Sequence, residues 1–198
     1  MKPLILVSGY ARSGTSLMCR MLSSAGLPVI VDHERKDKDN PYGYYESRRV
    51  SQLAKDCAAD REFVKGHGGH VLKVLCHMLR KMPTGLPYQT IYMMRDSAEI
   101  RWSVEKMNAR RMKRTERPSR MESDPGIERV QKAGLMWMER RSPLKLIVPF
   151  RELVSHPLLV AHRVEGFLGL EGHAEAMAAC VDTALYRNRS GQSGDQPS

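Results

Sequence analysis

The stretch GYARSGTS, residues 9–16, is the most informative part of this sequence. It follows the apolar run LILVSG (residues 4–9), which is typical of a buried parallel strand, and it precedes apolar residues at helical spacing. Its two glycines are spaced as in the phosphate loop G-x-x-x-x-G-K-[ST], where backbone N–H groups at a helix N-terminus hold an anion. Thr15 stands in place of the lysine, and the nearest basic residue is Arg12. The stretch therefore predicts an anion site, and the missing lysine argues against hydrolysis of ATP or GTP.

Apolar runs alternate with helical patterns along the rest of the chain. The expected strands are residues 4–9, 28–32, 71–75, 90–95 and 144–150. The expected helices begin near Ser13, Ser47 (to about Asp60), Asp96, Gly126 and Pro157, and Asp96 as N-cap forms a capping box with Glu99 three residues later. This alternation predicts an α/β fold, a three-layer domain like that of P-loop NTPases, with a central parallel sheet and helices on both faces. Ligands of such sheets bind at the carboxyl ends of the strands.

The composition is that of a globular protein with an excess of positive charge. Of 198 residues, 41% are hydrophobic and 27% are charged, which fits one domain over residues 1–189 and a disordered tail over residues 190–198. A net charge of +10 favours an anionic ligand or partner. No targeting signal is recognisable and no uncharged run approaches the roughly 18 residues that span a bilayer, so we expect a cytoplasmic protein.

Cysteine and histidine give no sign of a metal or disulfide site. The four cysteines have no short-spaced pair, and we expect buried thiols: Cys19, Cys57, Cys76 and Cys180. The two histidines of GHGGH (residues 66–70) have no carboxylate or cysteine partner nearby in the sequence and are expected in a loop. We therefore expect no metal site.

Two motifs at expected strand ends carry a family resemblance. The first is RSGTS, residues 12–16, and the second is RDSAEIRWS, in which Ser103 follows Arg95 by eight residues. Together they resemble the sulfotransferases that use 3′-phosphoadenosine 5′-phosphosulfate (PAPS), and the arginine of the loop is similar to that of the tyrosylprotein branch. VPFRELVSHPLLVAHRVEGFLGL (residues 148–170) and NPYGYYE (residues 40–46, as in bacterial members) resemble further elements of the family.

The resemblance implies transfer of a sulfuryl group from PAPS to a hydroxyl or amine acceptor, in line and without a metal. The cofactor-binding residues that it implies are Arg12, Ser13, Gly14, Thr15, Ser16, Arg95 and Ser103. Arg12 suits the leaving phosphate, and Lys73, in the strand VLKVL, is placed to reach the sulfuryl oxygens. The acceptor, whether small molecule or polymer, is not defined by these residues.

The general base is where the chain departs from the family. Many cytosolic members carry Lys-x-His, but here Lys73 is followed two residues later by Leu75. We expect the base among the polar residues after the second strand, first Glu46 or His33 and then Asp32 or Glu34.

Residues 108–126 are basic, poor in apolar residues and interrupted by two prolines, and are expected to form a loop. Few aromatic residues accompany this charge, so we expect no nucleic acid partner. Two alternatives remain: a nucleotide or small-molecule kinase with a degenerate loop, and a non-catalytic anion-binding module.

Overall fold

The structure is a computed structural model that describes residues 2–32, 42–54, 57–112 and 123–182. Its elements in chain order are β1 (Leu4–Gly9), α1 (Thr15–Ser24), α2 (Arg48–Gln52), α3 (Ala58–Gly66), β2 (Val71–Leu75), the 3-10 helix η1 (Cys76–Lys81), β3 (Tyr88–Met94), α4 (Ser97–Met112), α5 (Asp124–Arg141), β4 (Leu144–Pro149), α6 (Phe150–Ser155), α7 (Pro157–Leu168) and α8 (Ala174–Ala178).

The four strands form one parallel sheet in the order β2-β1-β3-β4. In its register Val7 of β1 lies beside Lys73 of β2 and Ile91 of β3. β1 and β3 therefore end at the same edge of the sheet, which brings the loop after β1 close to Arg95 after β3. This parallel sheet with helices around it confirms the predicted fold class.

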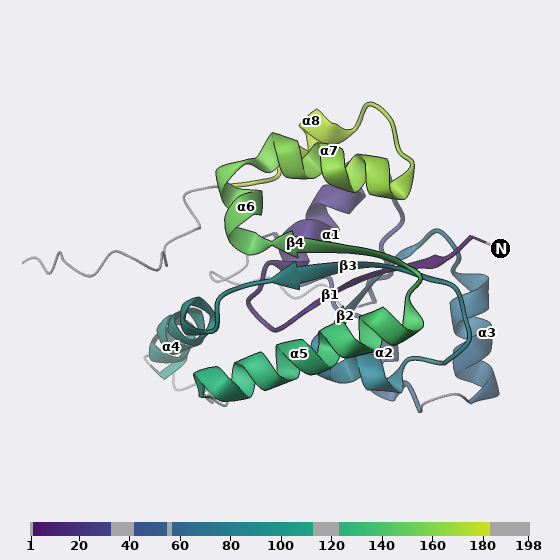
Figure 1. Cartoon of the computed structure of the whole chain (residues 1–198), viewed down its shortest axis with the longest axis horizontal. Coiled ribbons are helices and arrows are strands. Elements are labelled where there is room, and N and C mark those ends of the chain that lie inside the picture. The colour runs from purple at the N-terminus through teal and green to yellow at the C-terminus, as the bar shows by residue number, and fades with distance from the viewer. Residues whose placement is uncertain (1, 33–41, 55–56, 113–122, 183–198) are drawn as a thin grey trace, which may run out of the picture.

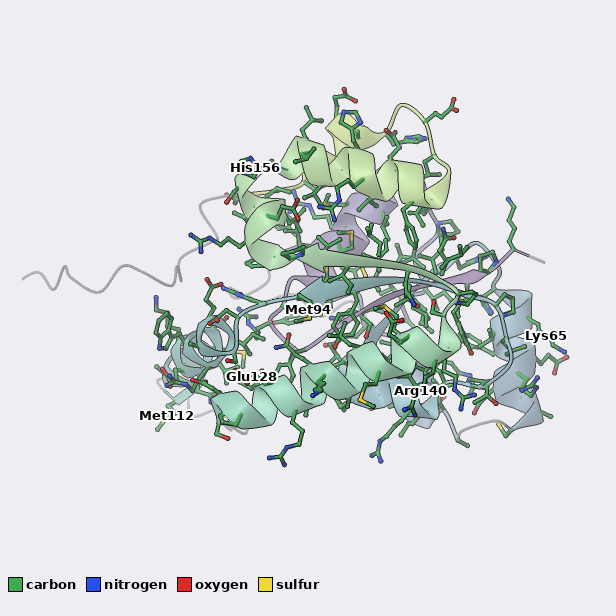
Figure 2. All side chains as sticks on the ribbon, in the orientation of Figure 1. Lys65, Met94, Met112, Glu128, Arg140 and His156 are labelled. Carbon is green, nitrogen blue, oxygen red and sulfur yellow. The ribbon has the colours of Figure 1, made fainter. Side chains whose placement is uncertain are left out.

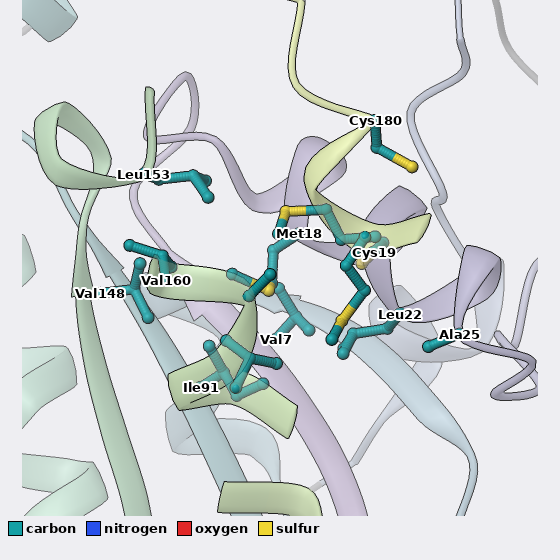
Figure 3. Close-up of a cluster of buried hydrophobic side chains, with 14 of the residues drawn as sticks. Val7, Met18, Cys19, Leu22, Ala25, Ile91, Val148, Leu153, Val160 and Cys180 are labelled. Carbon is teal, nitrogen blue, oxygen red and sulfur yellow. The ribbon is translucent and has the colours of Figure 1, made fainter. Parts of the chain in front are cut away.

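Helices cover both faces of the sheet (Figure 1). Side chains alternate along β1, so that Ile5 and Val7 belong to a core shared with α1 and α7, while Leu4 and Leu6 belong to a second core on the opposite face. Figure 3 shows the first core, where Met18 and Cys19 of α1 lie near Val160 of α7. Figure 2 shows side chains filling both spaces between the sheet and its helices. β1, β2 and β3 are thus buried on both faces, as expected for continuous apolar strands, whereas the edge strand β4 exposes most of its residues.

Two predicted elements are shorter or more broken than expected. Residues 28–32 do not form a strand: Val29 makes a single bridge to Val71 at the edge of β2. The helix predicted from Ser47 to about Asp60 is two helices, α2 and α3. The carboxylate of Asp60, which accepts bonds from the backbone N–H of Ala54 (2.7 Å) and the guanidinium of Arg49 (2.6 Å), fixes the break.

The prediction of a loop over residues 108–126 is wrong at both ends. α4 continues to Met112. α5 begins at Asp124, because Pro125 lies in its first turn, where proline is well tolerated. Residues 113–122, which contain much of the basic run, lie outside the described residues, as does the predicted tail. In addition, Phe150 begins α6 and does not end the strand, and η1 and α8 had no clear sequence signal.

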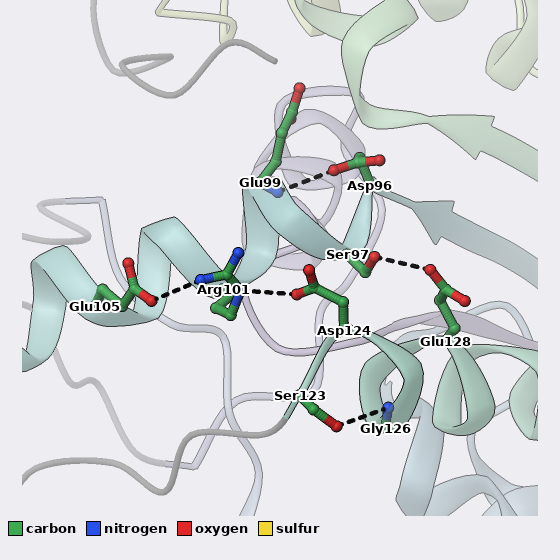
Figure 4. Close-up of polar contacts among 9 residues, drawn as sticks. All are labelled: Asp96, Ser97, Glu99, Arg101, Glu105, Ser123, Asp124, Gly126 and Glu128. Atoms are coloured by element: carbon green, nitrogen blue, oxygen red, sulfur yellow. Dashed lines mark hydrogen bonds and ion pairs between the residues drawn. The ribbon is translucent and has the colours of Figure 1, made fainter. Parts of the chain in front are cut away.

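α4 lies beyond the carboxyl end of β3 and is fixed to α5 (Figures 1 and 4). The hydroxyl of Ser97 donates to Glu128 (3.0 Å), and Nε of Arg101 donates to Asp124 (2.8 Å). The described ranges contain no helix that is long and apolar enough to cross a membrane.

Candidate functional site

The loop after β1 has a backbone that only glycine fits at two positions. A Cβ at Gly9 would come within 2.6 Å of the carbonyl oxygen of Met93, and one at Gly14 would come within 2.5 Å of the Phe150 ring. Gly14 is also left-handed (φ 95°) and is the N-cap of α1, with no side-chain bond to the first turn of the helix. The hydroxyl of Ser13 donates to the carbonyl of Tyr10 (2.7 Å) and closes the turn. The N-terminus of α1 thus opens directly onto the loop, as an anion site requires.

The two motifs, far apart in the sequence, meet through Arg12. Its Nε donates to the hydroxyl of Ser103 on α4 (3.0 Å), and its carbonyl accepts a bond from Arg95 (2.8 Å). Arg12 itself has a left-handed backbone (φ 71°), which is uncommon for a residue with a side chain. Arg12, Arg95 and Ser103, three of the residues predicted to bind the donor, therefore form one hydrogen-bonded cluster.

Arg95 is enclosed within this cluster. Its Nε donates to Glu99 (3.1 Å), and the side chains of these two residues are only 8% and 3% exposed. Its guanidinium carbon lies 4.3 Å from the centre of the Phe150 ring, in cation–π geometry. Phe150, which also contacts Gly14, therefore packs between the loop and Arg95.

Lys73 approaches the loop from the other side. It lies in the middle of β2, and its long side chain, not its backbone, reaches the strand end. Its Nζ donates to the hydroxyl of Ser16 (3.1 Å) and the carbonyl of Tyr44 (2.6 Å), and it lies 4.0 Å from Oε1 of Glu46. The hydroxyl of Ser16 in turn donates to the same carbonyl (3.2 Å). A cation from a neighbouring strand thus meets the loop at the residue after the missing lysine.

The four base candidates are placed differently. Glu46 is near Lys73 and its side chain is 41% exposed, so an acceptor can reach it. Asp32 accepts bonds from the hydroxyl of Ser47 (2.7 Å) and the backbone N–H of Arg48 (2.7 Å), and these bonds lower its pKa below the usual value. Asp32 therefore holds the start of α2, whereas Glu46 remains accessible beside Lys73. His33 and Glu34 lie outside the described residues.

The four cysteines and the two histidines of GHGGH have ordinary structural contacts. Burial raises the pKa of Cys19 to about 12 despite the positive charge of Lys73, so this thiol stays protonated. All four cysteines are thiols. Cys19, Cys76 and Cys180 are buried as expected, but Cys57 is only half-buried, so the expectation is wrong for that residue. His67 of GHGGH bonds the carbonyl of Phe63 through Nδ1 (2.7 Å) and packs against His70.

Three residues of the site carried no recognised role in the sequence. Tyr44 contributes a backbone carbonyl, which no side-chain pattern announces. Phe150 was counted as the end of a strand. Glu99 was expected only as part of a capping box: its N–H does donate to Asp96 (3.0 Å), and its carboxylate binds Arg95, four residues earlier. That i,i+4 spacing was the available signal for Glu99.

Comparisons with known proteins place the fold. No family model and no curated protein matches the chain. The sulfotransferase domain from the curacin biosynthetic pathway is 14% identical, over 96% of this chain and 93% of that one, with a TM-score of 0.55. The chain has a sulfotransferase fold.

Two further solved structures match at lower TM-scores. Mouse sulfotransferase SULT7A1 complexed with PAP has a TM-score of 0.47 and 15% identity, over 96% of this chain and 67% of that one. A sugar kinase from Janibacter sp. HTCC2649 has a TM-score of 0.44 and 13% identity, over 88% of this chain and 98% of that one. Because a fold can host several activities, the function is argued below from the site residues.

Proposed function

We propose that this chain is a sulfotransferase that uses PAPS as sulfuryl donor. The observation that carries the proposal is the contact of Arg12 with both Ser103, 91 residues later, and Arg95, 83 residues later, which unites the two motifs that follow β1 and β3. Cations and hydroxyls from three elements converge there on a loop whose glycines let its backbone pack closely against Met93 and Phe150. The excess of 32 basic over 22 acidic residues in the chain agrees with an anionic donor.

The donor would be held on both sides of the loop. The N–H groups at the start of α1, with Arg12, Ser13, Gly14, Thr15 and Ser16, would bind the 5′-phosphosulfate. Arg95 and Ser103 would bind the 3′-phosphate, a guanidinium and a hydroxyl being suitable donors to phosphate. PAPS supplies an activated sulfuryl group and a stable leaving phosphate.

Lys73 and Glu46 would act on the transferred group and its acceptor. Lys73 donates to the hydroxyl of Ser16 (3.1 Å), and its charge would stabilise the negative charge that develops on the sulfuryl oxygens. Glu46 would take the proton of the attacking hydroxyl or amine, because it is the described carboxylate next to Lys73 that remains accessible. His33 stays a second candidate for this role.

The donor is tested by calorimetric titration with adenosine 3′,5′-bisphosphate and, separately, with ATP–magnesium. We expect tight binding of the bisphosphate and a loss of at least about tenfold in affinity in Arg95→Ala. Preferential binding of ATP–magnesium would favour a kinase, and binding of neither would leave a non-catalytic module.

The base is tested in a sulfuryl-transfer assay once an acceptor is found in a panel of phenols, sugars and amines. Glu46→Gln is expected to lower kcat by about 10²-fold or more while affinity for the bisphosphate stays unchanged. If Glu46→Gln keeps full activity and His33→Gln loses it, the base is His33.

A further inference from the structure

The buried carboxylate of Glu99 has no part in the proposed chemistry, yet it lies inside the candidate site. The residue is 2% exposed, and its Oε2 accepts a bond from Nε of Arg95 (3.1 Å). A carboxylate beside a site for phosphate is unfavourable for anion binding by charge alone. Its presence there calls for a compensating role.

Glu99 completes a circuit of contacts around the loop. Arg95, whose Nε donates to Glu99, also donates through Nη1 to the carbonyl of Arg12 (2.8 Å). Arg12 donates through Nε to Ser103 (3.0 Å), and Ser103 lies four residues after Glu99 on α4. Residues at this spacing lie on the same side of a helix. Two residues on one side of α4 therefore act on the loop. Glu99 acts through Arg95 on the backbone of Arg12, and Ser103 binds the side chain of Arg12.

The circuit acts at the strained position of the loop. Arg12 has φ 71°, a conformation that persists in a residue with a side chain only when surrounding contacts fix it. The bond from Arg95 to its carbonyl and the bond from its side chain to Ser103 are such contacts. Phe150 adds to them by packing on Arg95 and against Gly14.

We propose that Glu99 is a positioning residue, which orients Arg95 so that Arg95 fixes the backbone of the phosphate loop. The effect on the loop stands by itself, whereas its effect on the donor rests on the proposed function. Two explanations of Glu99 predict opposite results. If only its charge matters, Glu99→Gln increases affinity for an anion; if it positions Arg95, the same change decreases it.

Glu105 provides a matched control on the same helix. It pairs with Arg101 at the same i,i+4 spacing and the same 3.1 Å distance, but its side chain is 38% exposed. Figure 4 shows Arg101 and Glu105 on the side of α4 toward Asp124, while the carboxylate of Glu99 points elsewhere. Glu105→Gln therefore removes the same charge from α4 without touching the circuit.

The experiment compares the unmodified chain, Glu99→Gln and Glu105→Gln. Amide hydrogen exchange without ligand is measured for residues 9–16 and, as reference, for residues 157–168 of α7. We expect exchange in the loop of Glu99→Gln to be accelerated at least about tenfold more than exchange in α7, and little change in either segment of Glu105→Gln. The Nε–Hε signal of Arg95 in ¹⁵N NMR spectra should shift in Glu99→Gln alone.

Titration with adenosine 3′,5′-bisphosphate gives the second readout. We expect about tenfold weaker binding in Glu99→Gln and unchanged binding in Glu105→Gln. Unchanged loop exchange in Glu99→Gln, or tighter binding, would overturn the positioning role. If the unmodified chain does not bind the bisphosphate, the proposed function fails while loop exchange still decides the role of Glu99. Should Glu99→Gln not fold, Glu99→Asp, which withdraws the carboxylate by one methylene, must show faster loop exchange.

Discussion

Two arginine–glutamate pairs, one at the start of α4 and one within it, are alike in spacing and distance but differ in their surroundings. Arg95–Glu99 and Arg101–Glu105 are both i,i+4 pairs at 3.1 Å. The first pair is buried, and its arginine also binds the loop of residues 9–16 through the carbonyl of Arg12. The second pair is about one-third exposed, and its arginine also binds Asp124 of α5. A local pattern of charges therefore does not distinguish a pair that organises a site from a pair that joins two surface helices. Burial and the third partner distinguish them.

The largest expected difference is in stability after loss of each arginine. Arg95→Ala leaves the carboxylate of Glu99 buried and without its guanidinium, and should lower the free energy of unfolding by about 3–5 kcal/mol. Arg101→Ala should lower it by about 1 kcal/mol or less, because water can solvate the carboxylates left behind. Urea denaturation measures both variants. Equal losses of unfolding free energy in the two variants would mean that the Arg95–Glu99 pair is not buried in solution.

The next effect compares two left-handed glycines at the two ends of α1. Gly14 (φ 95°) faces the Phe150 ring at 2.5 Å from an added Cβ, whereas Gly26 (φ 80°) has nothing within 4 Å. Both alanine variants have the backbone cost, so Gly14→Ala should cost about 1–3 kcal/mol more than Gly26→Ala through overpacking. Thermal unfolding of the two variants gives the difference. Similar losses would show that Phe150 moves away without cost.

A smaller effect separates two serines of α4. The hydroxyl of Ser103 accepts a bond from Arg12, and the hydroxyl of Ser97 donates to Glu128 on the side of α5. Ser103→Ala should weaken binding of adenosine 3′,5′-bisphosphate by about tenfold, since a bond to a charged group is lost at the site. Ser97→Ala should leave that affinity unchanged. Equal effects of the two substitutions on affinity in calorimetry would argue against a special role for the side of α4 that carries Ser103.

The smallest effect concerns salt. Glu105→Gln should change the free energy of unfolding by about 0.5 kcal/mol or less, and the change should disappear near 1 M salt, where charges are screened within about 3 Å. Glu99→Gln should lower the free energy of unfolding by more than Glu105→Gln does. That loss should persist at about 1 M salt, because a buried pair is screened far less. Denaturation at low and high salt measures both. A loss in Glu99→Gln that vanishes with salt would place Glu99 at the surface.

The elements that depend on local sequence were predicted well, and those that depend on distant partners were not. The strand before Gly9, the N-cap bond of Asp96 and the start of α7 at Pro157 follow from residues next to one another. The break between α2 and α3 depends on Asp60 bonding back to Ala54 and Arg49, and within the described residues the segment 28–32 pairs with β2 through the single bridge Val29–Val71. Pro125 interrupts a helix in the interior but begins one in the first turn, and the sequence pattern did not show which position it occupied.

The sequence by itself determined the strand–loop–helix unit around GYARSGTS and predicted an anionic ligand for it, because tight turns need glycine and an anion needs a helix N-terminus and nearby cations. Only the tertiary structure decided which side chains meet. The parallel register of β1 and β3 brings Arg12 to Arg95 and Ser103, and the face of β2 that Lys73 occupies sends it to Ser16. Such contacts follow from how strands align and helices cross. A buried carboxylate such as Glu99 therefore shows its role only in the folded chain.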